Sequence, residues 1–201
     1  MTRHAAEIAG QRVTVQCAEP VGRQAQWLLE LLTTQAARGL SLQDGRTIQV
    51  GWTILRLRKR GEDLVVCEPD YSGDAFNSER DDVTASLLVQ AQQNEVLRRL
   101  GEEGEAALFQ DKVVFASGSL AERRVYLERI PGSPEGDSGW YVGPADRRDA
   151  DPHLDAMYVY QLLGSRPALL QVFALPPKYL IVFDGDEIEA VLNQQNVNVW
   201  Q

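Results

Sequence analysis

The chain lacks the features that mark membrane, secreted and zinc-binding proteins. No apolar run approaches the roughly 20 residues of a membrane-spanning helix, and Tyr179 to Phe183 is among the longest. The first residues contain no apolar segment of the kind that secretory signals carry. The two cysteines and two histidines have no zinc-site spacing. We therefore expect a cytoplasmic protein in which Cys17 and Cys67 are buried free thiols, with a disulfide as the less favoured alternative.

Catalytic motifs are missing as well. The sequence contains no glycine-rich phosphate loop and no GxSxG nucleophile motif. His4 is expected in a frayed end and His153 at an exposed helix start, and neither has the neighbours that a general base requires. The residues therefore predict neither catalytic residues, nor a cofactor, nor a bound metal.

Acidic loops leave one catalytic alternative open. Glu68, Asp70 and Asp74 in the segment EPDYSGD could bind a cation, and so could the Asp184 to Glu187 turn. Neither segment has the full ligand pattern of a calcium loop, so a solvated loop and a strand-ending turn are the favoured interpretations. A metal-dependent hydrolase that uses these acids stays the competing hypothesis.

The composition is that of a folded protein with an acidic surplus. Hydrophobic residues make up 44% of the 201 residues and charged residues 24%, which is ordinary for a globular domain. The net charge of −9 argues against direct binding of nucleic acid, because phosphate recognition needs a basic surface. It permits a basic protein partner, although solubility alone also explains it.

Periodicity and turn signals predict an α+β fold, with a mainly antiparallel sheet, packed helices and two adjoining lobes. The acidic run Glu102 to Glu105 divides the predicted lobes, residues 1–105 and 106–201. Long helices are expected over 22–38 and 83–100, with shorter ones starting at Asp151-Pro152 and at Pro167. Strands are expected at 12–18, 47–59, 63–68, 112–116, 123–130, 140–142 and 179–183.

Acidic and aromatic residues gather in two loop regions that suit protein binding. Aromatic side chains anchor interfaces, and carboxylates pair with Arg or Lys of a partner. One of the neighbours Trp140 and Tyr141 should face the core, because successive strand residues point to opposite sides. The candidate contact residues are Glu68, Asp70, Tyr71, Asp74, Trp140, Tyr141, Asp146, Asp149, Asp151 and Asp155.

The C-terminal third resembles a known family. Ser138-Gly139-Trp140, a charged loop, Asp151-Pro152 before a helix and Pro167 before a second apolar segment follow one another within residues 137–183. This order resembles domain thirty-three of the immunity-protein series, from the polymorphic toxin and type VI secretion systems of bacteria. The resemblance implies a stoichiometric inhibitor rather than an enzyme.

The same resemblance implies a partner and a mode of action. The partner would be a cognate secreted toxin, and the absence of a secretory signal suggests one that acts in the cytoplasm, such as a DNase or another nuclease. An acidic inhibitor would suit a basic nuclease and could cover its active site, with no membrane involved. A non-enzymatic scaffold in a regulatory complex is the third hypothesis.

Overall fold

The computed structural model describes residues 1–146 and 153–200, which form two compact units, Met1–Ala91 and Gln92–Gln201. Each unit contains one mixed sheet, so the predicted α+β class with two sheet-containing lobes is confirmed. The boundary between the units lies inside the helix α2 (Thr84–Leu100). The predicted lobe boundary after residue 105 stays a prediction.

The N-terminal sheet has the strand order β1-β2-β5-β4-β3, with β6 paired to β5. The pair β2 and β5 is parallel and the other pairs are antiparallel, as expected for a mainly antiparallel sheet. Its strands are β1 (Thr2–Ile8), β2 (Gln11–Cys17), β3 (Thr47–Val50), β4 (Thr53–Arg60), β5 (Asp63–Pro69) and β6 (Glu79–Arg80).

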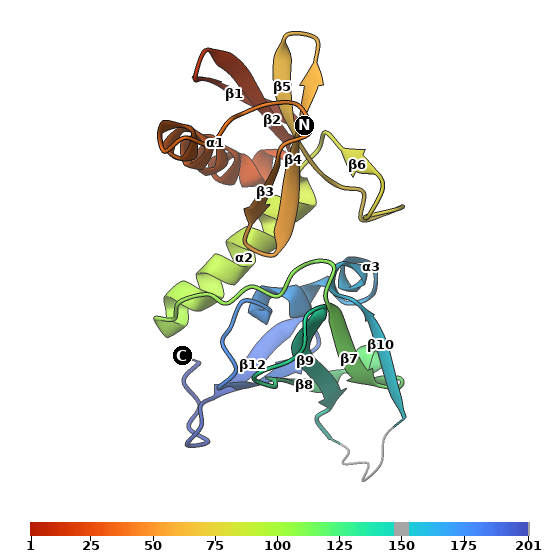
Figure 1. Cartoon of the computed structure of the whole chain (residues 1–201). Helices are drawn as coiled ribbons and strands as arrows, with labels where there is room; N and C mark the ends of the chain where they lie inside the picture. The colour runs from red at the N-terminus through yellow and green to blue at the C-terminus, as the bar shows by residue number, and fades with distance from the viewer. Residues whose placement is uncertain (147–152, 201) are drawn as a thin grey trace. The chain divides into compact units, whose positions relative to one another are not determined.

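The helix α1 (Gly22–Ala37) covers one face of this sheet, as Figure 1 shows. A short 3-10 turn, η1 (Glu19–Val21), leads into it. The predicted helical spacing is confirmed, because the apolar positions of α1 face the sheet and are buried. These positions are Ala25, Leu28, Leu29 and Leu32, and they pack against Val13, Val15, Cys17, Leu55, Leu57 and Val66.

The C-terminal sheet has the strand order β10-β7-β9-β8-β11-β12. Here β7 and β9 are the parallel pair and the other pairs are antiparallel. Its strands are β7 (Lys112–Ala116), β8 (Arg124–Arg129), β9 (Asp137–Pro144), β10 (Leu154–Tyr158), β11 (Leu180–Asp184) and β12 (Glu187–Leu192).

Short helical turns cover one face of the C-terminal sheet. Trp140 on β9 is 1% exposed, stacks on the ring of Phe173 and donates its indole N–H to the Phe173 carbonyl at 3.3 Å. Of the neighbours Trp140 and Tyr141, Trp140 is therefore the one that faces the core, and the expectation that one of them would do so is confirmed. The covering elements are η3 (Val159–Gln161), α3 (Leu162–Ser165) and η4 (Pro167–Val172), and η2 (Ser119–Ala121) follows β7.

The helix predicted to start at Asp151-Pro152 is wrong over Leu154–Tyr158, whereas its later part is helical, as η3 and α3. Leu154–Tyr158 forms the strand β10, which pairs with β7. Leu154, Met157 and Tyr158 fit a helical period, but so short a segment also fits a strand. It forms a strand because it pairs with the edge of β7. Asp151 and Pro152 themselves lie outside the described residues.

Three smaller expectations also need correction. His4 does not lie in a frayed end, because it belongs to β1 and is paired with Val15 of β2. The strand predicted over 47–59 is two strands, β3 and β4, separated by a turn in which Gly51 has φ of +55°. His153 is 81% exposed, as expected, but it precedes a strand rather than a helix.

The two cysteines are free and buried, which confirms the expectation. Cys17 lies in the core beneath α1, whereas Cys67 lies opposite Arg56 on the other face of the same sheet. Burial raises the pKa of both thiols, to about 12 for Cys67. Both sulfurs are therefore protonated at neutral pH.

Candidate interaction surfaces

Two of the predicted contact residues pack into the N-terminal unit, Glu68 fully buried and Tyr71 half-buried. Glu68 is 5% exposed and accepts the Ser86 main-chain N–H at 2.8 Å. Burial raises the pKa of Glu68 to about 7. The Tyr71 ring stacks on Trp52, and the Tyr71 and Thr53 hydroxyls are hydrogen-bonded at 2.5 Å. Both residues therefore contribute to the packing of this unit.

Asp70 and Asp74 shape the loop that carries them. Asp70 accepts hydrogen bonds from the main-chain N–H and the hydroxyl of Ser72. Asp74 accepts from the main-chain N–H groups of Phe76 and Asn77. These bonds lower the pKa of both carboxyls. In residues 1–146 and 153–200, no cluster of three or more His, Cys, Asp or Glu is arranged to hold a metal ion.

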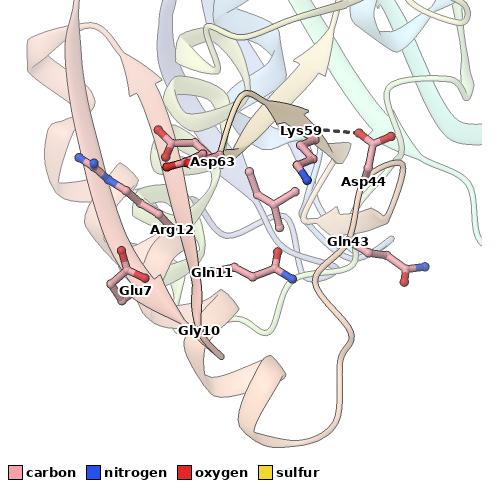
Figure 2. Close-up of a pocket in the computed structure, with 10 residues that line it drawn as sticks. Glu7, Gly10, Gln11, Arg12, Gln43, Asp44, Lys59 and Asp63 are labelled. Atoms are coloured by element: carbon pink, nitrogen blue, oxygen red, sulfur yellow. Dashed lines mark hydrogen bonds between the residues drawn. The ribbon is translucent and has the colours of Figure 1, made fainter.

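An open groove of about 760 Å³ lies in the N-terminal unit, shown in Figure 2. It is bordered by the β1–β2 turn, the end of the β4–β5 hairpin and the loop at Gln43, where Asp44 accepts the Lys59 main-chain N–H at 2.8 Å. None of its lining residues is aromatic, and the exposed charges include Glu7, Arg12 and Lys59. Such mixed, solvated charges define no class of ligand.

The face of the N-terminal sheet opposite α1, here called the N-terminal outer face, is closed by ion pairs. Arg56, Arg58 and Arg60 project from β4 on this side. Arg56 and Arg58 both pair with Glu79, and Arg60 pairs with Asp81 at 3.2 Å. Beneath them Val65 and Cys67 are buried, and the Cys67 thiol donates to Asp81 at 3.3 Å.

The corresponding face of the C-terminal sheet, here called the C-terminal outer face, is apolar. Residues paired across neighbouring strands share a face, and those paired with Tyr141 lie opposite Trp140 and the short helices. Most of these side chains are half-buried, whereas the inward residues are almost fully buried. The C-terminal outer face comprises Leu154, Ala156, Tyr158, Ala116, Val114, Tyr141, Gly143, Tyr126, Glu128, Leu180, Val182, Ala190 and Leu192, with Lys112 at one end and Arg124 and Asp184 at the other.

A pair of tyrosines occupies the middle of this face. The rings of Tyr126 and Tyr141 lie 5.8 Å apart and are tilted by 55°. A Cβ atom on Gly143 would stand 2.6 Å from the Tyr126 ring, so this ring rests directly on the β9 backbone. A glycine in a strand interior often marks such a close approach.

Charged side chains lie beside the tyrosines and at one end of this face. Glu128 is exposed beside Tyr141, and no ion pair engages it within the described residues. At one end of the face Arg124 pairs with both Asp146 and Glu189. Asp184 is paired with Arg123 at 2.5 Å.

The predicted C-terminal contact residues are distributed over several surfaces. Tyr141 and Asp146 lie on or beside the C-terminal outer face, while Trp140 lies in the core. Asp155 is opposite Phe115 on the covered side of the sheet, 3.8 Å from His153. Asp149 and Asp151 lie outside the described residues.

The negative charge of the chain is concentrated in one unit. Residues 92–201 contain 17 Asp and Glu against 10 Lys and Arg, which gives −7. Residues 1–91 contain 12 and 10, which gives −2 of the total of −9. The unit with the apolar outer face is therefore also the strongly acidic one.

Residues 92–194 match the family model described as Imm33-like domain. The match confirms the resemblance to an immunity-protein domain and extends it from the C-terminal third to most of the second unit. The matched segment makes up about half of the chain, and the chain belongs to the Imm33-like family. No curated protein and no solved structure matches it. None of the described helices is long and apolar enough to cross a bilayer.

Proposed function

We propose that this chain is an immunity protein that binds a cognate bacterial toxin in the cytoplasm and neutralises it without catalysing a reaction. The observation that carries the proposal is the Imm33-like match, which covers the acidic C-terminal unit. Stoichiometric inhibition needs a stable complementary surface and no reactive groups. The apolar, acid-rimmed sheet of this unit offers such a surface.

The charge of the C-terminal unit supports a basic toxin, and a nuclease is the class that fits best. Enzymes that cleave nucleic acid bind phosphates through basic surfaces. A unit with a charge of −7 would be attracted to such a surface over long range, and binding there would exclude the substrate. Inhibition would then result from occlusion of the active site.

The positions of the acidic residues that a metal-dependent hydrolase would use argue against that competing hypothesis. Glu68 is buried against the start of α2, and Asp70 and Asp74 accept hydrogen bonds within their own loop. In the second acidic segment, Asp184 is engaged by Arg123 and a β-turn follows. These groups are committed to the fold rather than gathered around a common point.

Co-expression tests the proposal directly. The toxin domain encoded beside the gene for this chain would be expressed alone, with this chain, and with an unrelated immunity protein as control. We expect growth only with this chain, and a stable one-to-one complex of the purified proteins. Continued killing despite soluble expression of this chain would overturn the proposal. A gene position far from any toxin gene would instead favour the scaffold hypothesis.

A further inference from the structure

We infer that the toxin docks on the C-terminal outer face, and that the matching toxin surface has an apolar centre with basic residues around it. This inference rests on the proposed function and adds the surface and the chemistry of the partner. It is carried by three observations: the apolar character of this face, its fixed aromatic pair, and its unneutralised acidic charge.

The apolar character is unusual for a sheet face turned away from the core. In an antiparallel sheet covered on one side, the other side is normally polar. Here the central row across four strands is Val114, Tyr141, Glu128 and Leu180, and Tyr126 and Val182 lie beside it. Leu154 on the edge strand β10 is 54% exposed. A contiguous apolar area of this kind marks an interaction site.

The aromatic pair is held in place before any partner arrives. Because Gly143 has no side chain, the Tyr126 ring packs onto the β9 backbone and against the Tyr141 ring. A tyrosine that is already fixed loses little conformational entropy on binding. Tyrosines are among the residues that contribute most to binding energy at the centre of interfaces.

The charge selects the kind of partner. Glu128 lies beside Tyr141 without an ion pair in the described chain, and Glu187 at the start of β12 has none either. A second copy of this chain docked on this face by a twofold axis would bring two units of charge −7 together, which is unfavourable. A partner with Arg or Lys around an apolar centre would instead pair with them.

The N-terminal outer face lacks these properties. Its arginines are already paired with Glu79 and Asp81 of the same unit. Docking there would break these pairs and leave charges to be desolvated. This face therefore supplies the matched control.

The test measures the affinity of purified variants for the purified toxin domain that is encoded beside the gene. Tyr141→Ser removes one ring and Val182→Lys places a cation in the apolar centre. Gln49→Lys adds the same charge to an exposed position on the N-terminal outer face. We expect at least tenfold weaker binding for the first two and unchanged binding for the control, with all three folded by circular dichroism and thermal melting.

Charge reversal provides an independent measurement. Glu128→Arg should slow association by about tenfold at low ionic strength, and the deficit should shrink as salt is added. Glu30→Arg on the exposed side of α1 is the control and should leave the rate nearly unchanged.

The outcomes separate the inference from the proposed function. If the wild-type chain binds the toxin and Tyr141→Ser, Val182→Lys and Glu128→Arg bind equally well, the docking surface is wrong and the function stands. If the wild-type chain does not bind at all, both are wrong. A concentration-dependent dimer in sedimentation that Val182→Lys abolishes would show that a second copy occupies this face, and would overturn the inference.

Discussion

The outer faces of the two sheets differ in what covers the side that carries no helices. Each sheet has one side covered by helical elements and one side turned away from them. In the N-terminal unit, arginines paired with Glu79 and Asp81 close the second side over buried Val65 and Cys67. In the C-terminal unit, tyrosines and aliphatic side chains stay half-exposed. A face whose charges are paired with one another gains little from a partner. Covering an apolar face, by contrast, removes apolar surface from water and lowers the free energy.

The largest expected effect contrasts the two sides of strand β9. Trp140→Ala should lower the free energy of unfolding by about 3–5 kcal/mol, because it empties a core site and removes the hydrogen bond to Phe173. Tyr141→Ala, one residue further on, should cost about 1 kcal/mol or less. Urea denaturation of both variants measures the difference. Equal losses would show that the C-terminal outer face is part of the core.

The next effect concerns the charged groups that the two units bury. The N-terminal unit buries Glu68, whereas the C-terminal unit buries Arg166, which donates to the carbonyls of Glu122, Arg123 and Gly185. The pKa of Glu68 is raised to about 7 from an ordinary 4.5. Folding therefore favours the protonated form, and stability present below pH 4.5 is lost as the pH rises through about 7.

Glu68→Gln should remove this loss. At pH 8 the variant should be about 2–3 kcal/mol more stable than the wild type, and the difference should vanish towards pH 4. Denaturation midpoints measured across this range provide the test, with Glu30→Gln on the exposed side of α1 as control. Parallel stability curves for the wild type and Glu68→Gln would contradict the prediction.

The smallest effect tests whether the N-terminal outer face is closed by its ion pairs. Glu79→Ala leaves Arg56 and Arg58 without their shared partner, and we expect a loss of about 1 kcal/mol or less because these pairs are partly exposed. The loss should be smaller in high salt, and protection against the toxin should be unchanged. Weaker toxin binding would show that this face contributes to recognition.

Much of the fold was predictable because local patterns and the tertiary structure agree. The apolar stripe of α1 and the alternation in β2, β5 and β7 each predict the element that forms. β1 was missed because its sequence, TRHAAEI, is polar for a strand, and this edge strand buries little more than Ile8. At Leu154–Tyr158 the spacing of the apolar residues also suits a helix, but pairing with β7 makes this segment the strand β10.

The candidate surface was only partly accessible from the sequence. Tyr141 was identified, but Tyr126, Glu128 and Val182 were not, because they come from strands that become neighbours only after pairing. Strand alternation could have indicated that Tyr126 and Glu128 share a face. Glu68 shows the opposite difficulty: an acid next to a polar loop gives no sign that a helix start will cover it.

The position of the unit boundary inside α2 has a practical consequence for separating the two sheets. A cut between Ala91 and Gln92 would leave each fragment with only about two turns of helix. Pieces of that length have little tendency to stay helical in water. Expression of either half should therefore retain all of Thr84–Leu100, so that the two fragments overlap in sequence rather than meet at a single residue.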